Sequence, residues 1–249
     1  MTPLLTLAFG VPAQVAVGTD LLFASITKSG GAWSYARRGQ VCWPLVLWLA
    51  FGSVPAAALT LTAVHRWHPD PAQFNAVLRP ALGLALLATA AALAFHAQIR
   101  MLGARAAVDR VPAFAGAQHC LGLASTNGQR NLRPVPTLAL GALIGVLVTL
   151  TSVGAGAIGV VALFFLYPAL PARQLVAADI AHAVPLTLIA GLGHAALGTV
   201  DWGMLLALLV GSLPAIHLGA RLAGRLPERM LRALLATLLL LVGLRLLWA

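Results

Sequence analysis

Residues 137–168 read TLALGALIGVLVTLTSVGAGAIGVVALFFLYP and contain no charged side chain. Similar apolar runs fill most of the 249-residue chain, in which 60% of the residues are hydrophobic and only 9% are charged. A soluble domain carries roughly 25% charged residues, so this chain could not cover a globule with a water-compatible surface. The composition predicts an all-α, polytopic integral membrane protein. Its length allows about seven spans of roughly 20 residues and leaves no room for a large soluble domain.

The run at 137–168 is interrupted near its middle by the sequence TSVGAGAIG at 151–159. A helical arm of about 15 residues reaches only about 22 Å, which is less than the hydrocarbon thickness of about 30 Å. We therefore expect a glycine-broken helix or a re-entrant hairpin here. The alternative is one long, tilted helix whose glycines allow close packing.

A more polar, arginine-rich stretch divides the apolar runs into two groups. We assign residues 1–97 to a first transmembrane repeat, 98–136 to a basic cytoplasmic linker and 137–249 to a second transmembrane repeat. The chain has 16 Lys and Arg against 6 Asp and Glu, a net charge of +10. In a soluble protein this excess would indicate nucleic-acid binding, but here the basic residues lie mainly between apolar runs, as in cytoplasmic loops. The expected partner is the lipid bilayer and not nucleic acid.

The two groups of runs are related in sequence. A shift of 159 residues aligns 12–66 with 171–225 without a gap and places Asp20 on Asp179. The basic loops of the two halves alternate in the sense expected if the second half is inverted in the membrane. We predict two inverted repeats of about three transmembrane helices each, together with the broken hairpin.

The same shift places Met1 on Val160, just after the glycine turn of the second half. The first repeat would then lack the first arm of its own hairpin. We expect this repeat to be truncated at its N-terminus, either because the coding start lies upstream of Met1, which we favour, or because the chain is a truncated product.

Four ionisable residues lie inside otherwise apolar runs, namely Asp20, Lys28, Asp179 and His182. An ionisable side chain at the centre of a membrane helix costs about 2.5–3.5 kcal/mol, so it usually faces a polar cavity or a partner. For the two acids, the alternative is capping of a helix after a local break. Lys28 could attract an anion or extend to the interface. Asp179 and His182 share a helix face and could relay a proton, although a membrane histidine is about as often a packing residue.

The glycine turn could bind an anion without any charged side chain. Exposed N–H groups at the start of a half-helix, at the positive end of its dipole, attract anions. Gly154 and Gly156 would leave these groups accessible, and Thr151 and Ser152 would add hydroxyl donors.

We expect structural roles for three other residues. Asp201 precedes an apolar run, and we expect it to cap the helix that begins there. Trp43 and Trp202 stand at matched positions at the starts of two runs and are typical of interfacial anchors.

Several stretches carry a family resemblance. They are PAQVAVGTD at 12–20, RGQVCW at 38–43, GSVP at 52–55, GAGAIG at 154–159, Asp179, and HAALGTVDW at 194–202. Together they resemble TauE/SafE-type permeases, proposed exporters of sulfite and organosulfonates, over nearly the whole chain. That family often has small hydroxylated residues where Asp20 and Asp179 stand. Carboxylates there would repel a dianion unless protonated or paired, which favours coupling to protons.

The resemblance implies a multi-pass secondary transporter, a permease or exporter, of the bacterial inner membrane. It would move a small anion, most directly sulfite or an organosulfonate, by alternating access without ATP. No metalloprotease, nucleophile-elbow or P-loop signature occurs in the sequence, so we expect no enzyme, no cofactor and no metal site. The expected substrate-binding residues are Thr19, Asp20, Lys28, Thr151, Ser152, Gly154, Gly156 and Asp179, and the expected proton-coupling residues are Asp179 and His182.

Two other functions fit the same residues. Asp20 and Asp179 could hold a metal cation, which would make the protein a carrier of a different solute. The spacing of Gly141 and Gly145 suits helix association and would serve a non-transporting scaffold as well as a carrier. A second copy of the chain is a candidate partner, and an intramembrane enzyme is the least favoured function.

Overall fold

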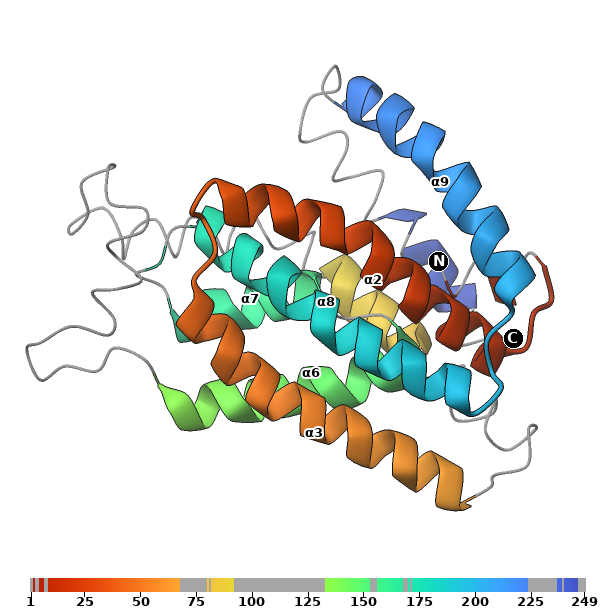
Figure 1. Cartoon of the computed structure of the whole chain (residues 1–249), viewed down its shortest axis with the longest axis horizontal. Coiled ribbons are helices and arrows are strands. Elements are labelled where there is room, and N and C mark those ends of the chain that lie inside the picture. Colours follow the sequence, from red (N-terminus) through yellow and green to blue (C-terminus); the bar gives the residue numbers. More distant parts are fainter. Residues whose placement is uncertain are drawn as a thin grey trace, which may run out of the picture.

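The computed structural model describes residues 2, 5–6, 9–67, 80, 82–91, 133–152, 156–167, 170, 172–223, 237–238 and 240–245. Regular secondary structure in these residues is entirely helical, as the composition predicts. The principal helices are α2 (Ala13–Arg37), α3 (Trp43–Trp67), α6 (Pro134–Thr151), α7 (Ala157–Leu166), α8 (Ala172–Ala196) and α9 (Trp202–Ala223) (Figure 1). Most of the stretch predicted to be a cytoplasmic linker, 98–136, lies outside the described residues.

The apolar run at 137–168 is broken, as its glycines predict. Helix α6 ends at Thr151, and Ser152 adopts a left-handed conformation with φ 54°. Gly156, with φ 138°, precedes the first residue of α7 in a conformation that side chains with a Cβ rarely adopt. The alternative of one continuous, tilted helix is therefore wrong.

The chain reverses direction at this break. A Cβ on Gly159 would lie 3.5 Å from Ile144 of α6, and the Tyr167 hydroxyl shares a hydrogen bond with Thr137 near the start of α6. The two arms are therefore antiparallel. The first arm is longer than expected, because α6 begins at Pro134, where a proline is favourable in the first turn. The 18-residue helix α6 is long and apolar enough to cross a membrane. The prediction that each arm is too short to span the membrane is therefore wrong for α6.

Helices α2 and α8 lie side by side and run in opposite directions (Figure 1). Close approaches join Gly18 to the Thr199 carbonyl and Gly191 to Leu22, where a Cβ would come within 2.8 Å. Glycine, which has no Cβ, is required for neighbouring segments to approach this closely. Earlier residues of α2 thus face later residues of α8.

Helices α3 and α6 run in the same direction and touch backbone to backbone. A Cβ on Gly141 would collide with the Leu49 carbonyl, and one on Gly145 would collide with the Ser53 carbonyl. Gly52 of α3 meets the Leu138 carbonyl of α6 in the same way. The spacing of Gly141 and Gly145 therefore serves helix association within the chain.

The helix boundaries of the two halves coincide under the shift of 159 residues. Both α2 and α8 contain 25 residues, and the shift places Ala13 on Ala172. The following helices begin at Trp43 and Trp202, which the same shift superimposes. Each connecting turn contains a glycine with positive φ, 64° in one half and 71° in the other. That the halves are inverted in a membrane stays a prediction.

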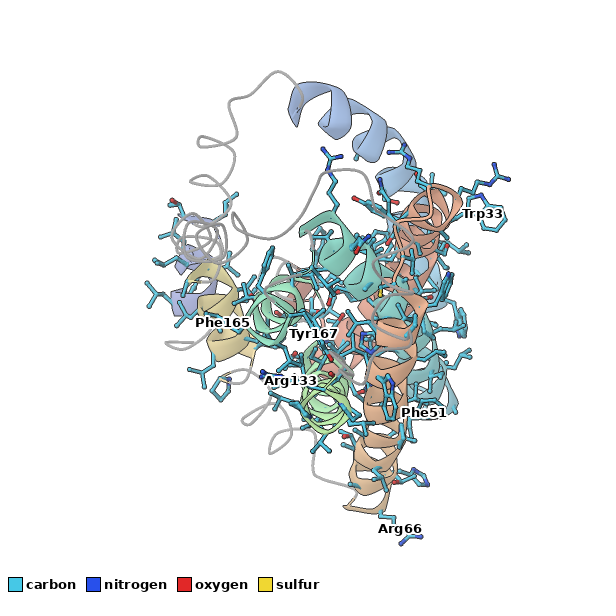
Figure 2. The ribbon with its side chains drawn as sticks, turned by 90° about the vertical axis from the view of Figure 1, so that its left-hand side faces the viewer. Trp33, Phe51, Arg66, Arg133, Phe165 and Tyr167 are labelled. Atoms are coloured by element: carbon cyan, nitrogen blue, oxygen red, sulfur yellow. The ribbon has the colours of Figure 1, made fainter. Side chains whose placement is uncertain are left out.

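The outer surface of the bundle is apolar. In the part of the chain that the structure describes, three helical segments are long and apolar enough to cross a membrane, namely Trp43–Arg66, Pro134–Thr151 and Arg173–Ala196. Phe51 and Phe165, each 69% exposed, project from the bundle (Figure 2). Large apolar side chains exposed in this way are unfavourable in water and favourable against lipid tails.

Candidate functional site

The carboxylate of Asp20 joins three parts of the chain inside the bundle. It accepts hydrogen bonds at Oδ2 from the Thr2 amide (3.0 Å), the Thr2 hydroxyl (2.7 Å) and the Ser152 hydroxyl (3.1 Å). The residue is 5% exposed. Ser152, which follows α6, therefore meets α2 at Asp20.

Neither intramembrane acid caps a helix. Helix α2 begins at Ala13 and α8 at Ala172, so Asp20 and Asp179 each lie two turns inside their helices. The capping alternative is therefore wrong, because the local breaks before these helices lie further upstream than the acids.

Asp179 lies against the first turn of α7. Its side chain is 2% exposed, and within the described residues its Oδ1 atom has no hydrogen-bond partner. A Cβ on Gly159 would collide with this oxygen, so a glycine is required for the carboxylate to come so close. The N-terminus of α7 begins at Gly156 and has no side-chain cap. The carboxylate and the positive end of a short helix dipole are thus brought together.

His182 lies one turn further along α8 and is fully buried. Its Nε2 atom is 2.7 Å from the Ser53 hydroxyl of α3, and its Nδ1 atom has no partner among the described residues. Ser53 is also fully buried. Ser53 is not among the residues that the sequence predicts for the site, because a single serine in an apolar run carries little signal beyond the Gly-Ser pair that the other half repeats.

Lys28 supplies the positive charge of this region. It lies two turns after Asp20 on α2 and is partly buried. Its charge interacts electrostatically with both Asp179 and Asp20. Lys28 is therefore near enough to both acids for their charges to act on one another.

Two hydroxyls predicted to bind substrate take part in structural contacts. The Thr19 hydroxyl accepts a hydrogen bond from the Asp201 amide (3.1 Å), and the Thr151 hydroxyl donates one to the Leu147 carbonyl (2.6 Å). Gly154 lies outside the described residues.

The turn between α8 and α9 is held by a second polar group. His194 donates from Nε2 to the Thr149 carbonyl (3.1 Å), and its Nδ1 lies 3.0 Å from the Thr199 hydroxyl. Both ring nitrogens of His194 therefore have hydrogen-bond partners. In His182, Nε2 has a partner and Nδ1 has none among the described residues.

Asp201 caps α9, as predicted. Its Oδ1 atom accepts a hydrogen bond of 2.9 Å from the Met204 amide. Trp43 and Trp202 are the first residues of their helices and are 57% and 59% exposed, which suits the predicted interfacial positions.

A family model described as sulfite exporter TauE/SafE matches residues 1–246. The chain belongs to the TauE/SafE family. It is also similar to a protein of Bacillus subtilis (strain 168) named "Probable membrane transporter protein YjnA", with 33% identity over 246 residues, covering 99% of this chain and 89% of that one. No solved structure matches it.

This TauE/SafE protein is thus an integral membrane transporter, and the resemblance noted in its sequence is confirmed. Its buried polar side chains come from α2, α3, α6 and α8 and from Thr2. Among the described residues, no group of three or more His, Cys, Asp or Glu comes together that could hold a metal ion.

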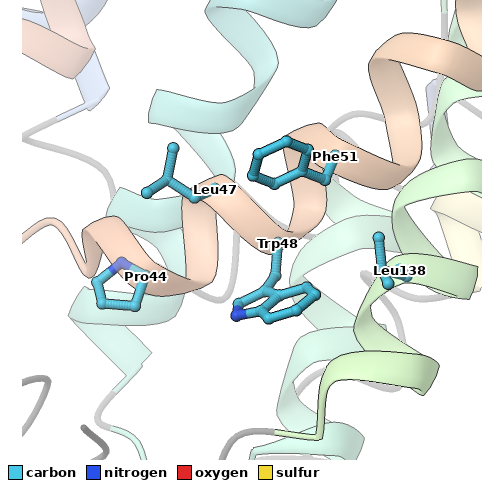
Figure 3. Close-up of a pocket in the computed structure, with 5 residues that line it drawn as sticks. All are labelled: Pro44, Leu47, Trp48, Phe51 and Leu138. Carbon is cyan, nitrogen blue, oxygen red and sulfur yellow. The ribbon is translucent and has the colours of Figure 1, made fainter.

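A separate groove of about 680 Å³ lies on the outside of α3 and α6. Its lining is apolar and consists of Pro44, Leu47, Trp48, Phe51 and Leu138 (Figure 3). It contains none of the ionisable residues described above.

Proposed function

We propose that this protein is a secondary transporter that moves a small sulfur oxyanion, sulfite or an organosulfonate, by alternating access. Membership of the family described as sulfite exporter TauE/SafE supports this substrate class. The bacterial inner membrane is its proposed location.

One observation carries the proposal: two buried polar atoms without partners lie on one face of α8. They are Asp179 Oδ1 and His182 Nδ1, which have no hydrogen-bond partner within the described part of the chain. An unsatisfied buried donor or acceptor destabilises a fold by about 1–3 kcal/mol, and such groups are rare in native proteins. A polar ligand or a proton that binds to them would remove this penalty.

The surroundings of these two atoms suit an anion. Lys28 supplies a positive charge that acts on the carboxyl group of Asp179. The N-terminus of α7, which has Gly156 as its N-cap, would supply amide donors at the positive end of a dipole. In this proposal, Lys28 and α7 attract the anion, while Asp179 and His182 bind and release a proton.

The fold supports an inverted repeat as the frame for alternating access. Helices α2 and α8, which the sequence shift superimposes, run in opposite directions. Transporters with inverted repeats bind substrate near the bilayer midplane, at broken helices between the repeats. The break between α6 and α7 would take this role, with the hairpin entering the membrane and returning to the same side.

The proposal predicts that two substitutions abolish flux. Lys28→Gln removes the positive charge, and Asp179→Asn removes the ionisable acid. Matched controls are Arg37→Gln, at the exposed end of α2, and Asp201→Asn, because asparagine caps a helix as well as aspartate does. We would measure uptake of ³⁵S-sulfite into proteoliposomes for the four variants and the unaltered chain.

The proposal expects the two site variants to lose at least about tenfold in rate, equivalent to about 1.4 kcal/mol, while the controls stay near the unaltered rate. Site variants that are folded and transport at the unaltered rate would overturn it. Flux of a divalent cation without any response to anions would instead favour a cation carrier.

A further inference from the structure

The two buried acids differ in how their charges are satisfied. Asp20 accepts three hydrogen bonds from Thr2 and Ser152, which stabilise a negative carboxylate. Asp179 Oδ1 accepts none from the described residues, although this side chain is the more deeply buried of the two. Two acids that the sequence repeat makes equivalent therefore have different environments.

A charge count shows what this difference means. With both acids ionised, Lys28 provides one positive charge against two negative charges, and an approaching anion meets net repulsion. If Asp179 is protonated, Lys28 and Asp20 balance each other. The Asp179 carboxyl then also carries an O–H donor that can bind an anion oxygen, beside the amide donors at the N-terminus of α7.

We propose that the anion binds only together with a proton on Asp179, so that one monoanion and one proton cross the membrane in an electroneutral step. The inference rests on the proposed anion transport and specifies its coupling. The proton is taken up by the Asp179 carboxylate from one side and released from the same oxygen to the other side after the anion leaves. The bundle carries the same net charge when empty and when loaded, so the membrane potential does no work on the cycle.

The groups around Asp179 come from four helices. Lys28 of α2 is the charged group that acts on it from a neighbouring helix, and His182 lies one turn away on α8 itself. From α7, Gly159 presents only backbone. From α3, Ser53 presents a neutral hydroxyl that is bound to His182. Asp20 of α2 also interacts with Lys28, and its carboxylate is already hydrogen-bonded.

The first test measures whether transport carries charge. The full chain is reconstituted in phosphatidylcholine–phosphatidylethanolamine vesicles, and uptake of labelled methanesulfonate, a monoanion, is followed with the potential clamped by potassium and valinomycin. The proposal expects accumulation on the alkaline side of a pH gradient and the same accumulation at 0 and −100 mV. A monoanion moving alone would change its accumulation ratio about 50-fold per 100 mV.

The second test measures the proton itself. Calorimetric titration of the detergent-solubilised chain with methanesulfonate, in buffers of different ionisation enthalpy, gives the protons taken up per anion bound. We expect about one for the unaltered chain and for Asp201→Asn, and none for Asp179→Asn. In vesicles, any methanesulfonate flux of Asp179→Asn should follow the potential and ignore the pH gradient.

The outcomes separate this inference from the proposed function. A folded, unaltered chain that moves neither methanesulfonate nor sulfite would overturn the proposed function itself. Anion flux that follows the membrane potential, or binding without proton uptake, would overturn electroneutral coupling alone. If Asp179→Asn does not fold, the flux and the proton uptake of the unaltered chain still decide whether transport is electroneutral.

Discussion

Replacing Gly159 with alanine should displace the Asp179 carboxyl group. The added Cβ would lie well within 3.0 Å of Oδ1, a separation that real Cβ atoms essentially never show. Because Asp179 is only 2% exposed, its side chain has little free space into which it can turn. Overpacking of this kind costs about 1–3 kcal/mol.

The same change should damage transport more than stability. A shift of about 1 Å in a positioned group can reduce a rate about 100-fold, and here the group would move away from the first turn of α7. We expect anion flux in proteoliposomes to fall at least about tenfold. The melting temperature of the detergent-solubilised chain should fall by about 2–4 °C for each kcal/mol lost.

Gly211→Ala is the matched control. Gly211 lies in α9, where a Cβ would meet nothing within 4 Å, so the substitution adds the same atom to a helix without a collision. Alanine is favoured over glycine in a helix by about 1 kcal/mol, and this variant should be as stable as the unaltered chain or more so, with unchanged flux. A Gly159→Ala protein with unaltered flux and melting temperature would refute the steric argument.

Two further changes test the contacts that hold the hairpin and the repeat. Tyr167→Phe removes the hydroxyl that bonds to Thr137 and to the Arg133 backbone. Thermal unfolding in detergent should show a loss of about 1 kcal/mol in the free energy of unfolding. An unchanged melting temperature would contradict this expectation. Asp201→Ala removes the cap of α9 and should lower the free energy of unfolding by about 0.5–2 kcal/mol. Asp201→Asn keeps a capping side chain and should keep the stability. Equal melting temperatures for the two variants would show that the cap contributes nothing.

The sequence is sufficient to predict the features that depend on local chemistry. The glycines after Thr151 predict the break between α6 and α7, and the position of Asp201 predicts its cap. The repeat predicts that α2 and α8 have matching boundaries. The break and the cap depend on residues that are neighbours in the chain, and the matching boundaries depend on the repeat. Both can be read from the order of the residues.

Other features depend on contacts between distant segments. Ser53 and His182 are 129 residues apart, and hydropathy gives no indication that they form a pair. Likewise, the sequence shows two matched acids, but not that Asp20 is bound by Thr2 and Ser152 while Asp179 Oδ1 is left without a partner. The length of α6 was underestimated because its first turn includes prolines and precedes the apolar run.

The glycine contacts between α3 and α6 restrict how this bundle can move. Sliding one helix along the other by a single residue would bring a Cβ-bearing neighbour into the place of Gly52, Gly141 or Gly145, where it would meet a carbonyl oxygen. Such interlocked surfaces permit neither translation nor rotation about the helix axis. We therefore expect the two helices to move as one rigid unit, with conformational change at their contacts with the remaining helices.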